Sequence, residues 1–371
     1  MVDCIKNKST NDSNPPTIVV VGGSWSGVSV VRSILQQSHP AKVILVSASE
    51  QAYNNTAAPR LFVKPELVAQ TVVDLRLLEK RKGKHEFELV VGTATKLDVA
   101  NNELTVDTQS EPIKYDYIVL ATGQRSEIHA FKPHGDVRKS VDSVNEISKA
   151  IKQAQSICIV GGGATGVEVT GEIAKAYPKK SVTLITGDKD GPLKPFGAKT
   201  SQAAEKRLND LKVTVINKMG EVNGNKVTFK DDESKSKIFD LVIPTFGYTP
   251  NTSFIPKQYL DDKDYVNVDD HFKVKGTDNV FATGDCASTT AKSAADINLV
   301  QSSVIQNTIK REMFGENISP KQYQTAPLTS LVPVGPDGGV GKLWGWRVPS
   351  IFVWYAKGKD FMIPKTESLL T

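Results

Sequence analysis

Two segments far apart in the chain share one order of apolar and polar positions. In the first, residues 17–21 form an unbroken β-branched run, which is typical of a parallel strand buried on both faces. A glycine-rich stretch, residues 22–27, follows directly. Apolar residues then recur at helical spacing from Val28 to Leu35, and residues 42–46 form a second apolar run. The pattern predicts a strand, a tight turn, a helix and a second strand.

The same order returns downstream. Residues 156–160 are apolar, residues 161–166 are glycine-rich, a helical pattern runs from Val167 to Ala174, and residues 181–185 form another apolar run. The chain therefore contains a βαβ unit twice. We expect an α/β fold with two Rossmann-type dinucleotide-binding domains.

The two glycine-rich turns carry the fingerprint of a dinucleotide site. A pyrophosphate must approach bare backbone N–H groups at the N-terminus of a helix, where the dipole favours negative charge. The second unit has glycine at all three fingerprint positions and the first has serine at the middle one: Gly161, Gly163 and Gly166 against Gly22, Ser24 and Gly27, with Gly23 beside Ser24. One such motif is weak, since glycine turns also serve packing, but two copies predict two bound dinucleotides.

The ends of the two second strands lack the acidic residue that commonly binds an adenosine ribose. Ser47 follows the first of these strands and Thr186 the second. Glu50 and Asp188 are nearby substitutes, but neither stands at the usual position. The choice between NADH and NADPH stays open.

Composition and charge exclude some classes of partner. The 371 residues are 39% hydrophobic, which allows a sizeable core and two or three domains. The net charge of +5 comes from 46 basic and 41 acidic residues, and the lysines are scattered along the chain. A solvated surface explains them better than a nucleic-acid footprint does.

The start of the chain carries no recognisable targeting signal. Residues 1–13 are too polar for a signal peptide, Val2 excludes N-myristoylation, and no run approaches the ~20 apolar residues that span a bilayer. Residues 1–16 read as a disordered lead. We expect a cytoplasmic protein, with the outer face of mitochondria or lipid droplets as alternatives.

The cysteines and histidines exclude two kinds of chemistry. Cys4, Cys158 and Cys286 are too far apart in sequence to form a neighbouring dithiol, which argues against dithiol flavin reductases and fits a reducing compartment. The five histidines show no metal-ligand spacing, so we expect no metal.

Three further segments carry a family resemblance. Residues 116–123, which include Ala121, Thr122 and Gly123, close the first unit, residues 240–251 close the second, and residues 279–285 follow. Together they resemble flavoproteins with two dinucleotide-binding domains, in which a strand ending in Gly-Asp turns its Asp toward the ribityl chain of the flavin. Asp285 is the matching residue.

Within that superfamily the chain resembles the apoptosis-inducing-factor-like group, especially its short fungal members and the ferroptosis suppressor proteins, which are relatives of type II NADH dehydrogenases. The most specific matches are residues 22–27, residues 57–60, a turn at residues 338–341 and the tail at residues 357–365. The resemblance implies electron transfer from NAD(P)H through FAD to a quinone or similar small acceptor. It also leaves room for a homodimer.

The resemblance further implies a fold of the glutathione-reductase type, in which an NAD(P)H domain interrupts the FAD domain and a C-terminal segment covers the flavin. The expected limits are a lead at 1–16, the FAD domain at 17–145 and 253–310, the NAD(P)H domain at 146–252, and an aromatic-rich segment at 311–371.

Two charged residues have candidate roles. Glu168 follows Gly166 in the expected first helical turn, and by resemblance faces the flavin and holds the nicotinamide carboxamide; the alternative is a charge at a helix terminus. Glu172, one turn later, is expected at the surface. Arg60 is expected beside the flavin, where it could bind the pyrophosphate or stabilise reduced flavin, and a surface loop arginine is the equal alternative.

The C-terminal region concentrates aromatic residues: Trp344, Trp346, Phe352, Trp354, Tyr355 and Phe361. They suit either a hydrophobic lid on the flavin domain or a quinone channel or membrane-facing patch, with Lys357 and Lys359 at its polar edge. By resemblance, Lys357 and Met362 line the acceptor site, and we assign Lys357 a catalytic role. Cys286, which lacks a partner thiol, is interpreted as a packing residue.

Two rival functions follow from the same residues. One is a redox-gated signalling flavoprotein in cell death, which would turn over slowly with every quinone. The other is a flavin reductase that serves a protein such as a ferredoxin, which would need a concentrated charged docking patch that the sequence does not show.

Overall fold

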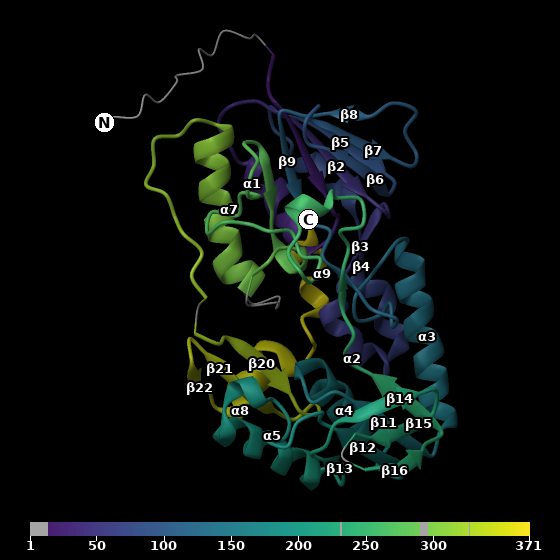
Figure 1. Cartoon of the computed structure of the whole chain (residues 1–371). Coiled ribbons are helices and arrows are strands. Elements are labelled where there is room, and N and C mark those ends of the chain that lie inside the picture. The colour runs from purple at the N-terminus through teal and green to yellow at the C-terminus, as the bar shows by residue number, and fades with distance from the viewer. Residues whose placement is uncertain (1–13, 231, 290–295, 326) are drawn as a thin grey trace.

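The computed structural model describes residues 14–230, 232–289, 296–325 and 327–371. Residues 1–13, most of the lead expected to be disordered, lie outside the described residues. The described chain forms two α/β halves, one above the other, with the C-terminal segment alongside (Figure 1). The predicted fold class is confirmed.

The first half is built on a five-stranded parallel sheet. Its strand order is β19-β9-β1-β2-β5, so β1 lies at the centre with β2 and β9 as neighbours. The strands are β1 Thr17–Val21, β2 Lys42–Ser47, β5 Glu86–Val91, β9 Tyr117–Leu120 and β19 Val280–Ala282. The last of these comes from the far part of the chain, as an FAD domain in two parts requires.

The second half repeats this plan on a four-stranded parallel sheet of order β13-β12-β11-β17. Its strands are β11 Ser156–Val160, β12 Ser181–Ile185, β13 Thr214–Ile216 and β17 Leu241–Pro244. Helices α4 Ala164–Ala176 and α5 Ala198–Asp210 belong to it, as does a small antiparallel sheet of β14 Gly220–Asn223, β15 Lys226–Phe229 and β16 Asp232–Ile238. The four strand positions predicted for the two βαβ units are confirmed, with β2 one residue longer than expected.

Smaller elements surround the two sheets. The short strands are β3 Gln51–Tyr53, β4 Val72–Asp74, β6 Ala94–Asp98, β7 Glu103–Val106, β8 Ile113–Lys114, β10 Gln124–Arg125 and β18 Thr249–Pro250. The further helices of the first half and the connection are α1 Trp25–Leu35, α2 Ala58–Leu61, α3 Val137–Gln153 and α7 Ser302–Thr308. Helix α3 runs across the limit expected at 145/146. The domain limits stay a prediction.

The C-terminal segment contacts both halves. Strands β20 Ser330–Pro333, β21 Gly339–Leu343 and β22 Trp346–Arg347 form an antiparallel sheet that packs on α4 and α5. Helix α8 Ser350–Val353 follows, and α9 Thr366–Leu370 lies against α1 and β4 (Figure 1). The prediction of a turn at residues 338–341 is wrong, because residues 339–341 are extended and pair with β20.

Candidate active site

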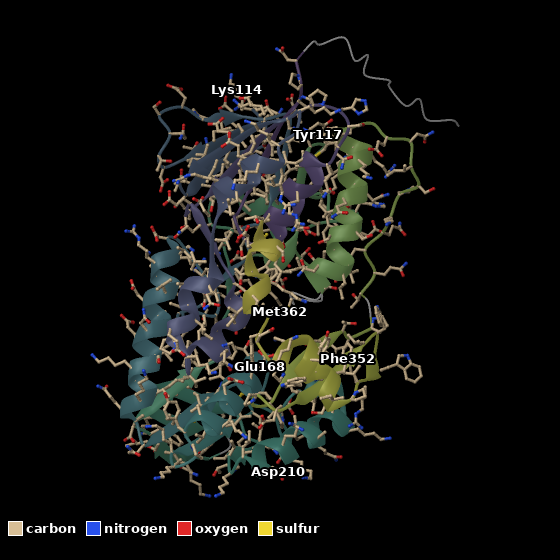
Figure 2. All side chains as sticks on the ribbon, turned by 180° about the vertical axis from the view of Figure 1, so that it is seen from behind. Lys114, Tyr117, Glu168, Asp210, Phe352 and Met362 are labelled. Atoms are coloured by element: carbon tan, nitrogen blue, oxygen red, sulfur yellow. The ribbon has the colours of Figure 1, made fainter. Side chains whose placement is uncertain are left out.

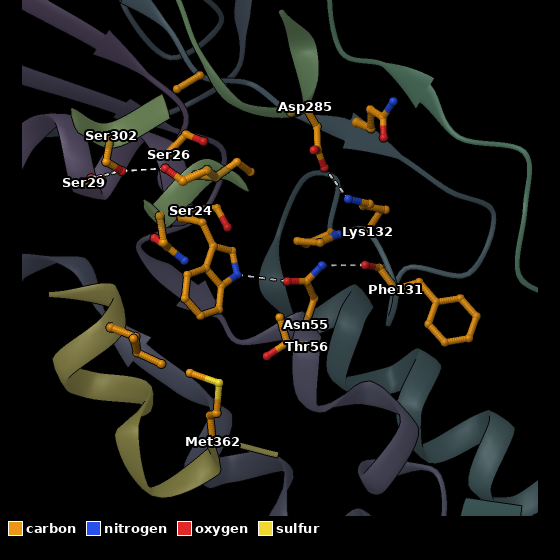
Figure 3. A pocket seen from close by; sticks show the side chains of 18 of the residues that line it. Ser24, Ser26, Ser29, Asn55, Thr56, Phe131, Lys132, Asp285, Ser302 and Met362 are labelled. Carbon is orange, nitrogen blue, oxygen red and sulfur yellow. Dashed lines mark hydrogen bonds and ion pairs between the residues drawn. The ribbon is translucent and has the colours of Figure 1, made fainter. Parts of the chain in front are cut away.

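A cavity of about 740 Å³ lies where the two halves and the C-terminal segment meet. Ser24 and Asp285 reach it from the first half, Glu168 from the second, and Lys357 and Met362 from the C-terminal segment. Figure 3 shows Asp285 and Lys132 on one side of this cavity and Met362 on the other. Three parts of the chain therefore contribute to one site.

The FAD side of the cavity starts from the turn before α1. Gly22 has φ +121°, and a Cβ there would overlap the carbonyl oxygen of Ala121, so the turn requires glycine. Ser24 is the N-cap residue of α1 and lines the cavity. The turn thus presents a helix N-terminus to the cavity, which suits a pyrophosphate.

Of the other residues predicted to bind FAD, some line the cavity and some do not. Ala121, Thr122 and Gly123 line the cavity, and the Thr122 hydroxyl donates to the carbonyl oxygen of Asn251 at 2.7 Å. A Cβ on Gly23 would overlap the Ser47 side chain, and a Cβ on Gly27 would overlap the Gly22 carbonyl oxygen. They shape the turn and are not among the residues that line the cavity.

Asp285 has the geometry expected of a flavin ligand. Its side chain is buried and its Oδ2 accepts from the Lys132 ammonium, whereas its Oδ1 is buried with no hydrogen-bond partner in the part of the chain that the structure describes. A buried carboxylate oxygen without a donor is costly, so a ligand hydroxyl is a fitting partner for it. The residues present therefore fit a ribityl chain at Asp285.

Sequence reasoning missed Lys132 and Asn55. Lys132 pairs with Asp285, and its Nζ lies 5.6 Å from the ring centroid of Tyr248. Asn55 accepts from the Trp25 indole at 3.0 Å and donates to the carbonyl oxygen of Phe131 at 2.6 Å (Figure 3). A single lysine and a single asparagine in loops give no periodic or motif signal, so only the fold could reveal them.

The second glycine turn repeats the first. Gly161 has φ +123°, and a Cβ on Gly166 would overlap the Gly161 carbonyl oxygen. Gly163, the N-cap residue of α4, differs, because a Cβ there would meet nothing within 4 Å. The protein's own packing does not require glycine at 163, which fits a position kept bare for a ligand.

A second cavity, of about 810 Å³, opens at the carboxyl ends of the second sheet. Gly161, Thr186 and Gly187 line it, together with Lys230 and Phe246. Ligands of doubly wound sheets bind at this edge. This cavity therefore suits the adenosine part of NAD(P)H.

The nearby acids expected as ribose substitutes are both paired. Glu50 bonds to Arg76, and Asp188 accepts from Lys194 at 2.7 Å. At the usual ribose positions, Ser47 donates to the carbonyl oxygen of Ser49 and Thr186 to that of Asp188. Neither second strand ends on a free carboxylate, so the geometry leaves the nucleotide preference open.

Glu168 and Lys357 meet in the first cavity. Lys357 Nζ lies 2.6 Å from Glu168 Oε1, and the Glu168 side chain is almost fully buried. Burial raises the pKa of the Glu168 carboxyl, and the Lys357 ammonium opposes that rise. Glu168 was expected in the first turn of α4, but α4 begins at Ala164 and has no acid in its first turn. A specific cation, rather than the helix dipole, therefore balances its charge, and the alternative of a helix-terminus charge is wrong.

Arg60 and Glu172 occupy a different place from the one expected. Arg60 is 5% exposed and Glu172 is 3% exposed. The surface position expected for Glu172 and the surface alternative for Arg60 are therefore both wrong. Arg60 Nε lies 2.5 Å from Glu172 Oε2, and Arg60 also bonds to the carbonyl oxygens of Gly358 and Lys359. Arg60 is not among the cavity-lining residues, because α2 packs on α4 and directs the guanidinium there. Contact of Arg60 with FAD thus finds no support in this geometry.

The described cysteines show no sign of redox activity. Cys286 is fully buried and its thiol donates to the carbonyl oxygens of Leu120 and Thr283, which agrees with a packing role. Burial raises the pKa of the Cys158 thiol to about 12, so it stays protonated. Among the described residues no group of three or more His, Cys, Asp or Glu could hold a metal ion. Cys4 lies outside them.

The aromatic residues of the C-terminal segment divide into two sets. Phe361 is fully buried, whereas Trp344, Trp346 and Tyr355 are largely exposed, Trp346 by 80%. Figure 2 shows Met362 between the two halves, with Glu168 below it in the lower half and Phe352 to one side of Glu168 on the C-terminal segment. No described helix is long and apolar enough to cross a membrane.

Two Rossmann modules that share a cavity define the class of nicotinamide-dependent flavoproteins, and comparisons with known proteins agree. The family model for pyridine nucleotide-disulphide oxidoreductases matches residues 16–308. The oxidoreductase ptaL of Pestalotiopsis fici is 32% identical over 94% of this chain and 98% of its own length. Ferroptosis suppressor protein 1 of Xenopus tropicalis is 23% identical over 94% of each chain.

The chain belongs to the pyridine nucleotide-disulphide oxidoreductase family. The solved sulfide:quinone oxidoreductase of Aquifex aeolicus has the same fold, with a TM-score of 0.74 at 14% identity over 95% of this chain and 92% of that one. The predicted resemblance to the apoptosis-inducing-factor-like group is confirmed, since an apoptosis-inducing factor homolog of Dictyostelium discoideum is also a relative. FAD and NAD(P)H, the cofactors predicted from the sequence, are those of the family, and the chain is an FAD-dependent NAD(P)H oxidoreductase.

Proposed function

We propose that this oxidoreductase passes electrons from NAD(P)H to a quinone or a similar small acceptor. The observation that carries the proposal is the single cavity in which Asp285, Glu168 and Lys357 meet. Bound FAD supplies the redox chemistry, because it accepts a hydride and returns two electrons. The Aquifex aeolicus protein with the same fold is a sulfide:quinone oxidoreductase, which supports the same class of acceptor here.

The protein's own groups have distinct tasks in this proposal. The N-terminus of α1 would bind the pyrophosphate of FAD, and Asp285 Oδ1 would accept a hydrogen bond from a ribityl hydroxyl. Reduction of a quinone consumes two protons, and Lys357 Nζ, bonded to Glu168, is a donor in the cavity that can supply one. Met362 offers an apolar, adaptable contact to an acceptor ring.

Acceptor turnover in a Lys357→Met variant tests this assignment, with Lys359→Met as the matched control. Lys359 is two residues away, is exposed, and lies over the Tyr355 ring rather than in the cavity. We expect the first variant to slow oxidation by a soluble quinone about 100-fold and the second to have no effect. Equal rates in both variants would contradict the role of Lys357.

We further propose that the exposed aromatic patch contacts a membrane surface. The patch consists of Trp344, Trp346, Ile351, Phe352 and Tyr355, all exposed. Residues 338–359 contain no acid, and they include Lys342, Arg347 and Lys359, which suits an anionic lipid surface. Sedimentation with phosphatidylserine vesicles should retain the wild type and lose a Trp344→Ser, Trp346→Ser variant. Equal retention of both proteins would refute the contact.

A further inference from the structure

A buried ion pair lies one helical turn from the Glu168–Lys357 pair. Glu172 follows Glu168 by four residues on α4, so both side chains project from one face of the helix. Arg60 Nε lies 2.5 Å from Glu172 Oε2, and Arg60 Nη2 donates to Glu172 Oε1 at 3.1 Å. The pair joins α2 of the first half to α4 of the second. Its bidentate geometry fixes the guanidinium in one orientation.

The same guanidinium holds the backbone that carries Lys357. Arg60 Nη2 donates to the carbonyl oxygen of Gly358 at 2.8 Å, and Nη1 to that of Lys359 at 3.2 Å. These two carbonyls stand at the end of the helical stretch that continues α8 through residue 358. The C-terminal carbonyls of a helix lack intrahelical partners and attract a cation. Arg60 therefore caps the helix directly after Lys357.

Phe361 connects the two cations. Its fully buried ring lies 4.9 Å from Arg60 Cζ and 5.6 Å from Lys357 Nζ, measured to the ring centroid. Its backbone N–H donates to the Lys357 carbonyl oxygen at 2.7 Å. Phe361 has φ +51°, a strained conformation for an aromatic residue that the surrounding contacts must hold in place. The contacts thus run from Glu172 through Arg60, Phe361 and Lys357 to Glu168, and one turn of α4 closes the ring.

We propose that Arg60 and Glu172 are positioning residues that hold the Lys357 ammonium on the Glu168 carboxylate. They act through the backbone of residues 358 and 359 and through the Phe361 ring, without touching the cavity. The inference deepens the proposed function, since it rests on the role given there to Lys357. A buried pair that serves stability alone would leave the reactivity of Lys357 unchanged.

The test is acylation of lysines by an amine-reactive reagent on the FAD-loaded protein, read residue by residue by mass spectrometry. Lys357 is protected by its ion pair and its side chain is only 19% exposed. We expect Arg60→Lys and Glu172→Gln to raise the labelling rate of Lys357 about 10-fold. Lys365 is an internal standard in the same segment, because it is exposed and stands outside the stretch whose carbonyl oxygens Arg60 binds.

A control variant separates positioning from general loosening. Lys175, also on α4, forms an exposed ion pair with Asp337 of the C-terminal segment at 2.6 Å, away from the ring of contacts. Lys175→Met should leave Lys357 labelling at the wild-type rate. Retention of FAD and a cooperative unfolding transition verify that Arg60→Lys and Glu172→Gln are folded. Unchanged Lys357 labelling in both variants, with only a lower unfolding temperature, would overturn the inference.

A double-mutant cycle adds a kinetic readout. Arg60→Lys should slow reoxidation of the reduced flavin by a soluble quinone about 10-fold in the wild-type background and less than about 2-fold in a Lys357→Met background. Equal effects in both backgrounds would show that Arg60 acts independently of Lys357. If no quinone reoxidises the protein, the proposed acceptor is wrong, but the labelling result still decides the positioning role.

Discussion

The two βαβ units of this chain share a backbone and differ in what their helices carry. Gly22 and Gly161 have φ values of +121° and +123°, and the last glycine of each turn packs against the first in the same way. The side chains beyond the turn differ. Helix α1 has no acid in its sequence, whereas α4 carries the buried Glu168 and Glu172. The turn of each unit suits a dinucleotide. The units differ in the helix that follows, because only α4 adds buried acids beside the site.

The middle position of the turn shows where the two units diverge. Ser24 and Gly163 are both N-cap residues, but Ser24 makes no side-chain capping hydrogen bond and Gly163 faces open space. Neither position is fixed by packing alone. Substitutions at the two turns therefore test whether the units differ in function.

The largest effect should come from Gly27→Val. A Cβ at residue 27 would overlap the Gly22 carbonyl oxygen, so the turn must open. We expect a loss of about 3 kcal/mol of unfolding free energy and loss of FAD, measured by denaturant titration and by the flavin absorbance of the purified protein. A variant that keeps both would show that α1 does not need this close approach.

Gly163→Val should separate the two modules. Residue 163 has φ −72° and ψ −179°, which valine adopts without strain, and nothing crowds its Cβ. The variant should keep FAD and its unfolding temperature, yet slow reduction by NADH about 100-fold, because the side chain displaces the pyrophosphate. Loss of FAD with intact reduction by NADH would mean that the two modules are assigned the wrong way round.

Glu168→Gln should change the pH dependence rather than the fold. Burial raises the pKa of Glu168, so the carboxylate takes up a proton, and the Lys357 pair is lost, at a pH above that of an ordinary glutamate. Activity should therefore fall as the pH drops through this raised pKa. The glutamine variant should lack this acid limb and be slower by about 10-fold above it. A pH profile of flavin reduction by NADH for both proteins measures this, and identical acid limbs would exclude Glu168 as the titrating group.

The smallest effect should come from Ser24→Gly, which gives the first unit the full fingerprint of the second. Because the Ser24 hydroxyl makes no capping bond, its loss should cost a few tenths of a kcal/mol at most, about 0.3. The unfolding free energy should therefore be unchanged within about 0.3 kcal/mol, and the FAD dissociation constant should stay within about 2-fold of wild type. A loss of FAD binding would show that the hydroxyl is itself a cofactor ligand.

The sequence predicted the parts of this molecule that repeat or alternate. The four strands of the βαβ units and both glycine turns were evident from local patterns, whereas Asp285, which follows its strand, was found through the family resemblance. The residues that escaped prediction are isolated in sequence and meet only through the fold. Lys132 pairs with Asp285 across 153 positions, and Arg60 meets Glu172 across 112. No periodicity encodes such pairs, which is why both charges of the Arg60–Glu172 pair were expected in other surroundings.

The decisive measurement is the visible absorption spectrum of the FAD-loaded protein during anaerobic addition of NADH or NADPH and then of a soluble quinone. We predict a flavin spectrum that bleaches with the nicotinamide and returns at once with the quinone. Bleaching that every quinone reverses only slowly would contradict the proposed acceptor and favour the signalling function. A protein that takes up no FAD, or whose flavin neither nicotinamide reduces, would contradict the account as a whole.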